Sequence, residues 1–162
     1  MALTTLGYER AAIGSSSGGG STKGIGDTSL LIQLVCSLSL EEDPLVCSEL
    51  VSIYSGFQVA RWSSQRAAGK LRSSEDSGAE LSGAKLALAN NLTDVSNFVA
   101  RVLGPKTQAD TRELGTHTWS QLLLGTRCSR IAGCTDEIHR NAMVERGLDL
   151  PRDPSTTEAP SR

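Results

Sequence analysis

Between residues 80 and 103, apolar side chains recur every three or four positions, and this spacing constrains the fold more than any other feature of the sequence. Because an α-helix has 3.6 residues per turn, residues so spaced lie on one face, and the pattern predicts a long amphipathic helix. Gly104 and Pro105 end it, because glycine accepts a left-handed cap and proline cannot continue a helix. The apolar stripe consists of Leu81, Ala84, Leu88, Leu92, Val95, Val99 and Val102.

A second long helix is predicted to begin at Asp43 and Pro44. An aspartate side chain can accept hydrogen bonds from the first amides of a helix, and proline fits the first helical position. The helix is predicted to run to about Ala68, with its apolar face formed by residues at helical spacing, namely Leu45, Leu50, Ile53, Tyr54, Phe57 and Ala60. Helical patterns also cover residues 2–13 and the short apolar segment 30–40.

Two further helical segments are predicted toward the end of the chain. Apolar residues gather in 119–124, and the last helix is expected to begin after Thr135, a favourable N-cap, and to end at Gly147. No segment alternates polar and apolar residues as a half-buried strand would. We therefore expect an all-α fold, a four- to five-helix up-and-down bundle.

The chain is expected to form one domain. Its 162 residues suffice for one modest core and hardly for two. Residues 1–150 are assigned to the bundle, with a Gly/Ser-rich loop at 14–26. Residues 151–162 are predicted by composition to be a disordered tail.

Charge and hydropathy exclude several classes of function. The net charge is −2 at pH 7, and lysine and arginine are scattered, which argues against a nucleic-acid-binding surface. The longest apolar-leaning run, residues 29–40, is well short of the roughly 20 residues that cross a bilayer. The first residues lack the layout of a signal peptide. We expect no nucleic-acid or membrane partner and a cytoplasmic location.

The cysteines do not form a metal-binding pattern. None of Cys36, Cys47, Cys128 and Cys134 belongs to a CxxC pair, and no histidine lies at a zinc-finger spacing from them. We expect ordinary buried or semi-buried thiols, rather than metal ligands or a disulfide. No metal is predicted.

Three local features could carry chemistry, and each has a plainer alternative. Residues 130–135 lead into a helix start, whose free backbone amides can hold a phosphate or a carbonyl oxygen, although a tight interhelical turn would have the same sequence. Glu9 beside Arg10 is either a buried base with a raised pKa or part of the surface. His117 and His139 are isolated, which is typical of solvated or core histidines.

Three segments resemble acyl-CoA dehydrogenases. Residues 130–152 are similar to the ending R-I-A-G-G-T-x-E-I-x-R-N-I-I-x-E-R-x-L-G-L-P-R of a divergent branch of that family abundant in actinobacteria. Residues 4–10 resemble the T-L-x-x-E-R motif that opens the C-terminal helical domain, and the helix after Asp43 resembles a D-P-x-V-R helix. The resemblance covers roughly residues 4–152.

The resemblance implies the C-terminal helical domain of an oligomeric FAD enzyme that converts an acyl-CoA to a trans-2-enoyl-CoA. In the family a carboxylate removes the α-proton, FAD takes the β-hydride, and electrons leave through an electron-transfer flavoprotein. An N-terminal helical domain and a β domain supply most contacts to the flavin and the acyl-CoA. Since neither is present in this chain, we expect a domain fragment that is inactive alone.

The resemblance also implies a candidate base. Most members place the catalytic glutamate at the position of Gly133, and glycine cannot act as a base. A minority place it at the position of Glu9, which is therefore our candidate catalytic residue. The alternative hypothesis is a non-catalytic assembly module that pairs with a full-length acyl-CoA dehydrogenase.

Four residues match cofactor-binding positions of the family. Thr135 and Glu137 match positions near the flavin at the start of the last helix. Arg101 and Gly104 match positions that contact the FAD of a neighbouring subunit. The chain departs from the family pattern there, because Arg101 replaces a common glutamine and Pro105 replaces a second glycine.

Overall fold

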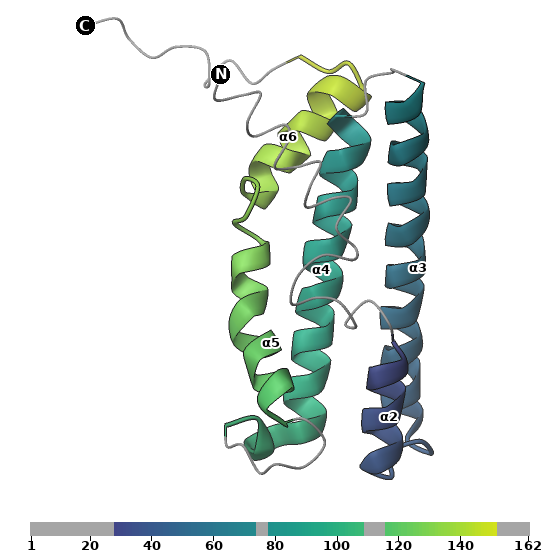
Figure 1. Ribbon diagram of the computed structural model, residues 1–162, viewed down its shortest axis with the longest axis vertical. Helices are drawn as coiled ribbons and strands as arrows, with labels where there is room; N and C mark the ends of the chain where they lie inside the picture. Colours follow the sequence, from purple (N-terminus) through teal and green to yellow (C-terminus); the bar gives the residue numbers. More distant parts are fainter. Residues whose placement is uncertain (1–27, 74–77, 109–115, 152–162) are drawn as a thin grey trace, which may run out of the picture.

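The computed structural model describes residues 28–73, 78–108 and 116–151, and these residues are almost entirely helical. No strand occurs in those ranges, so the predicted all-α class is confirmed. The long helices pack side by side as the predicted bundle (Figure 1). In chain order the elements are α2 (Ser29–Ser37), α3 (Pro44–Arg72), α4 (Gly78–Leu103), the short 3-10 helix η1 (Gly104–Gln108), α5 (Thr116–Ser129) and α6 (Asp136–Gly147).

Helix α4 lies at the centre of this bundle. Helix α3 runs antiparallel to it on one side, and α5 and α6 lie end to end along the other side (Figure 1). Because α4 packs against three helices, its buried surface is wider than the single predicted stripe. It includes Phe98 and also Lys85, a charged residue on a helix expected to bury only apolar ones.

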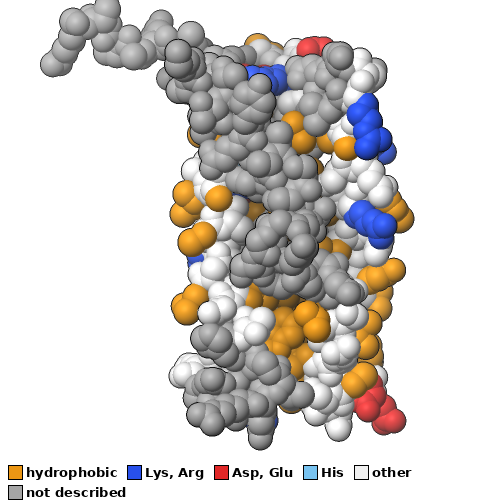
Figure 2. All heavy atoms as spheres, in the orientation of Figure 1, with side chains coloured by type: hydrophobic (Ala, Val, Ile, Leu, Met, Phe, Trp, Pro, Cys, Tyr) orange, Lys and Arg blue, Asp and Glu red, His pale blue; other side chains and the backbone are white. Residues whose placement is uncertain are grey.

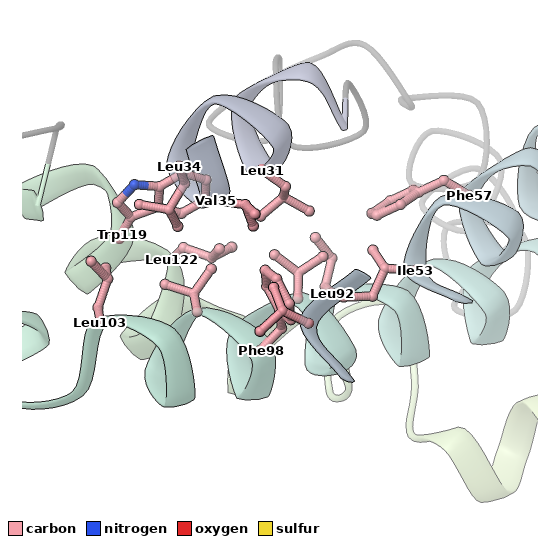
Figure 3. Close-up of a cluster of buried hydrophobic side chains, with 13 residues drawn as sticks. Leu31, Leu34, Val35, Ile53, Phe57, Leu92, Phe98, Leu103, Trp119 and Leu122 are labelled. Carbon is pink, nitrogen blue, oxygen red and sulfur yellow. The ribbon is translucent and has the colours of Figure 1, made fainter. Parts of the chain in front are cut away.

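The core is an apolar cluster to which α2, α3, α4 and α5 all contribute (Figure 3). Val95, Phe98 and Val99 at its centre have no exposed surface. Burial of one such side chain contributes about 1.5–3 kcal/mol to stability, and this term holds the helices together. Its buried members are Leu31, Leu34, Val35, Val46, Ile53, Phe57, Leu92, Val95, Phe98, Val99, Leu103, Trp119 and Leu122.

The start of α3 is capped as the sequence predicts. Oδ1 of Asp43 accepts hydrogen bonds from the amides of Leu45, at 2.8 Å, and Val46, at 3.3 Å. The helix ends at Arg72, four residues later than expected. Within the additional turn, Lys70 pairs with Glu80 of α4, so this polar part of the helix also has a partner across the bundle.

Two residues predicted to lie on the buried face of α3 do not. Leu45 is 75% exposed and Tyr54 is 48% exposed. The buried face is rotated from the predicted one and runs through Val46, Ile53, Phe57, Ala60 and Ala67. A spacing of three, four or seven residues fits more than one face when apolar residues are frequent, and packing against α4 selects one of them.

Several sequence predictions concern the ends and connections of the helices. Gly104 has a φ of +52°, so the predicted left-handed cap after α4 is confirmed. Helix α5 is longer than the predicted segment 119–124. Residues 2–13, the loop 14–26 and the tail from 152 onward lie outside the described residues.

All four cysteines are free thiols, as predicted. The expectation that they are buried or semi-buried is wrong for Cys36 and Cys128, which are exposed. Among the described helices, none is both long enough and apolar enough to span a membrane.

Candidate functional site

The loop between α5 and α6, residues 130–135, has an unusual backbone conformation. Gly133 has a φ of +66° and Cys134 a φ of +93°. Glycine adopts positive φ freely, but a side chain there crowds the backbone at a cost of about 1–2 kcal/mol. Cys134 therefore needs support from the surrounding structure to keep this conformation.

Lys85 of α4 supplies that support from the interior of the bundle. Its side chain is 1% exposed. The ammonium donates hydrogen bonds to the carbonyl oxygens of Arg130, at 3.2 Å, and Cys134, at 3.0 Å, and to Oδ1 of Asp136, at 3.3 Å. A lysine has three N–H donors, so every one of them meets an oxygen.

Asp136, the first residue of α6, balances the buried charge. Its side chain is 3% exposed, and its Oδ2 accepts a hydrogen bond from Nε of Arg130 at 2.8 Å and lies 2.6 Å from Nη2 of the same guanidinium in an ion pair. Burial acts to raise the pKa of Asp136, but the hydrogen bonds and charges of Arg130 and Lys85 outweigh it and lower the pKa below its usual value of 3.8.

Thr135 and Glu137 lie at the start of α6, and both are exposed. Thr135 occupies the N-cap position with extended backbone angles, as predicted, but its side chain makes no capping hydrogen bond to the backbone. The carboxylate of Glu137 accepts from its own backbone amide and from the Thr135 hydroxyl, and these bonds lower the pKa of Glu137. The carboxylate of Glu137, rather than the Thr135 hydroxyl, thus accepts a hydrogen bond from a first-turn amide of α6.

Arg101 and Gly104 lie far from Thr135 and Glu137. Arg101 follows Lys85 by sixteen helical positions, which at 1.5 Å per residue separates them by about 24 Å along α4. The guanidinium of Arg101 pairs with Glu49 of α3 and lies 5.7 Å from the ring centroid of Phe98. The structure therefore places the candidate cofactor residues in two regions, one beside Lys85 in the first third of α4 and one at the end of α4.

Gly104 leaves open space beside the end of α4, since a Cβ atom added there would meet nothing within 4 Å. Glu9, the candidate base, lies outside the described residues. Gly133 is half of the positive-φ turn in the α5–α6 loop, and it has no side chain to offer.

A hollow of about 630 Å³ lies between α3, the start of α4 and α6. None of Arg101, Gly104, Thr135 and Glu137 lines it. Its wall is mostly apolar, and the lining residues are Ser63, Arg66, Ala79, Glu80, Gly83, Ala84, Arg140, Met143, Val144, Gly147 and Leu148.

The hydrogen-bonded group formed by Lys85, Arg130 and Asp136 was not predicted from the sequence. A signal was present, because Lys85 stands four residues after Leu81 and seven before Leu92, within the apolar stripe itself. A lysine in such a position has to find acceptors inside the fold. The position of Lys85 within the apolar stripe therefore indicated a buried ion pair, but not which residues accept from the lysine.

These features define a class of protein, an all-α helical bundle domain. In it the exposed start of α6 follows a loop that Lys85 of α4 holds by hydrogen bonds. Residues 1–148 match the family model for the acyl-CoA dehydrogenase C-terminal domain. The chain belongs to this family.

Two solved structures have a similar fold. The Tcur3481-Tcur3483 steroid ACAD is 18% identical with a TM-score of 0.79, and the match covers 94% of this chain and 39% of that chain. A glycine-to-alanine variant of it is 19% identical with a TM-score of 0.77, and the match covers 94% and 40%. The chain thus spans about two fifths of the length of these structures. No curated protein sequence gave a match.

Proposed function

We propose that this chain forms the C-terminal helical domain of an FAD-dependent acyl-CoA dehydrogenase and needs further protein parts for turnover. The family match over residues 1–148 carries this proposal. Gly133 at the usual base position and the two-fifths coverage of the similar structures support the need for those parts. The remaining contacts to FAD and acyl-CoA would come from them.

The described residues leave room for FAD in two regions, at the start of α6 and at the end of α4. Thr135 and Glu137 are exposed at the start of α6, where a helix end favours electron-rich groups. Gly104 leaves room for a planar group to approach the backbone. Arg101 would first have to leave Glu49, and an exposed ion pair of this kind is worth at most about 1 kcal/mol. The two regions are far enough apart to serve two different cofactors, as in an oligomer.

The reaction assigns one chemical role to this chain. FAD, when bound, accepts the hydride that leaves Cβ of the acyl group. Glu9 is our candidate for the carboxylate that removes the α-proton, because Gly133 offers no side chain at the more common position. Electrons would leave the assembly through an electron-transfer flavoprotein.

The test starts with a tagged chain purified from its native host, in parallel with the isolated chain. Both are examined for flavin absorbance and for dye reduction with a straight-chain acyl-CoA and with a steroid-derived CoA thioester. We expect the complex to be yellow and active and the isolated chain to be neither. Turnover by the isolated chain would contradict the need for other parts, and a complex without flavin would contradict the enzymatic function.

A matched pair of variants then tests the base. In the active complex, Glu9→Gln should lower the rate by about 10²–10⁴-fold, the usual contribution of a general base, with the flavin retained. Glu42→Gln, an exposed glutamate before α3, should leave the rate unchanged. An equal rate in both variants removes Glu9 from the mechanism.

One observation favours the alternative, a non-catalytic assembly module. Val51, Val59 and Trp62 are exposed on one side of α3, Trp62 by 61%. Apolar side chains are visible along the flank formed by α3 (Figure 2). Exposed apolar surface of this kind often marks a protein interface.

Under this alternative, α3 would contact a full-length dehydrogenase. Trp62→Ser should abolish co-purification with the flavoprotein, whereas Leu124→Ser, which removes an 80% exposed leucine from α5, should not. Glu9→Gln would then leave the activity of the complex unchanged. If Trp62→Ser and Leu124→Ser behave alike, α3 is not the contact surface.

A further inference from the structure

We propose that Lys85 is the positioning residue of the α5–α6 loop, and that its hydrogen bonds to the carbonyls of Arg130 and Cys134 turn the Thr135 amide outward for a bound flavin. The role in flavin binding rests on the proposed function. The role in shaping the loop does not, because it follows from the contacts of Lys85 alone.

The two carbonyl contacts hold the loop at both of its ends. Arg130 follows the last residue of α5, and Cys134 lies two residues before α6. Lys85 reaches both carbonyl oxygens, at 3.2 and 3.0 Å, from a helix more than forty residues earlier in the chain. A single ammonium group therefore ties α4 to the point where α5 ends and to the point where α6 begins.

The planarity of the peptide bond connects Lys85 to Thr135. The described residues contain no cis peptide, so the carbonyl of Cys134 and the amide of Thr135 point in opposite directions. The carbonyl points at the buried ammonium of Lys85, at 3.0 Å. The amide of Thr135 must then point away from Lys85, and Thr135 as a whole is exposed.

The same contact offsets the strain at Cys134. A cysteine at a φ of +93° would relax toward negative φ, which would swing its carbonyl off Lys85 and its neighbouring amide inward. The hydrogen bond from Lys85 opposes that rotation. One donor, the Lys85 ammonium, thus fixes both the direction of the Thr135 amide and the strained conformation of Cys134.

The ion pair with Asp136 has a separate role in this arrangement. Asp136 compensates the charge of Lys85, and it also accepts a hydrogen bond from Arg130 and forms an ion pair with its guanidinium. If the ion pair alone shaped the loop, removing either partner would have the same effect. If the carbonyl bonds shape it, only the loss of Lys85 releases the loop.

The experiment measures amide hydrogen exchange of residues 131–135 in the full chain. Lys85→Met, which keeps length and loses all three donors, should raise exchange in the loop by about tenfold or more, while the centre of α4 stays protected. Asp136→Asn should have a clearly smaller effect. Lys70→Met, which removes the Lys70–Glu80 pair between α3 and α4, is the matched control and should leave the loop unchanged.

In Lys85→Met the buried carboxylate of Asp136 keeps Arg130 but loses one of its two cationic partners, and this loss could prevent folding. The double variant Lys85→Met with Asp136→Asn removes both buried charges, and the Arg130 guanidinium that loses Asp136 is 40% exposed and stays in contact with water. The double variant should show the same rise in loop exchange. Loop exchange equal to that of the wild type in this double variant, or equal effects of Lys85→Met and Asp136→Asn, would overturn the proposal.

Flavin binding is measured separately, with FAD as the probe, in the complex purified from the native host. We expect the Lys85→Met complex to bind FAD about tenfold or more weakly than the wild-type complex. A wild-type complex that binds no FAD contradicts the proposed function and leaves the exchange result for Lys85 standing. Faster loop exchange with unchanged FAD affinity contradicts only the flavin role of Lys85.

Discussion

A Cβ atom added to Gly56 of α3 would lie 2.5 Å from Oδ1 of Asn91 on α4, a distance that real Cβ atoms essentially never show. Asn91 is buried, and its side-chain Nδ2 has no hydrogen-bond partner among the described residues. Helices α3 and α4 therefore approach at a point that glycine permits and that any larger residue would open.

Gly56→Ala should destabilise the bundle by about 1–3 kcal/mol, the usual cost of overpacking, measured by urea unfolding. Gly69→Ala in the same helix is the control, because its Cβ would meet nothing within 4 Å. It should stabilise α3 by about 0.5–1 kcal/mol through helix propensity. Adding Asn91→Ala to Gly56→Ala should recover part of the loss, and equal effects of the two glycine substitutions would show that the approach is not tight.

Asp43→Ala should lower the free energy of unfolding by about 1 kcal/mol. It removes the oxygen that accepts from the amides of Leu45 and Val46, and these amides lose their cap. Thermal unfolding measures the change. Glu42→Ala removes a neighbouring exposed charge without the cap, and a similar loss in both variants would assign the effect to charge.

Asp136 should make the stability depend on acid pH. Its pKa in the folded protein is lower than the usual 3.8, so the folded state binds the proton less readily than the unfolded state does. The stabilisation is fully present above that usual value and is lost as the pH falls below it toward the folded pKa. Unfolding by urea at a series of pH values checks this.

Asp136→Asn should be about 3–5 kcal/mol less stable at neutral pH, because it leaves Lys85 buried without its counter-charge. The difference from the wild type should shrink below about pH 4. Asp94→Asn, on the exposed side of α4, serves as the control and should follow the wild-type curve. A constant difference across the pH range would assign the loss to packing.

Phe98→Ala should destabilise the bundle by about 3–5 kcal/mol, because the ring is fully buried at the centre of the cluster. Calorimetry measures the loss. Phe98→Leu keeps most of the volume and should cost clearly less. The two variants should unfold alike only if the cavity left by the alanine collapses.

The features predicted correctly from the sequence are local ones. Asp43 and Pro44 mark the start of α3, and Gly104 marks the end of α4, because capping depends on a few neighbouring residues. The end of α3 was placed four residues too early because the pairing of Lys70 with Glu80 depends on how α4 lies against α3. Leu45 and Tyr54 were placed on the wrong face for the same reason.

The candidate site was predictable only in part. The sequence indicated that the loop before α6 matters, and it placed Thr135 at the N-cap. It could not show that Lys85, some fifty residues earlier, holds this loop, because the pairing depends on how α5 and α6 lie along α4. Arg101 was matched by position, but its pairing with Glu49 depends on α3.

The end-to-end arrangement of α5 and α6 along α4 has a consequence for what determines the direction of α6. Helix α4, with 26 residues, is one continuous helix, whereas the 14 residues of α5 and the 12 of α6 form two shorter helices beside it. Residues 130–135 connect α5 to α6, and Lys85 donates hydrogen bonds to the carbonyl oxygens of Arg130 and Cys134 in this connection. Since the apolar cluster contains no residue of α6, the direction of α6 depends on this connection and on its own packing against α4, and not on the cluster.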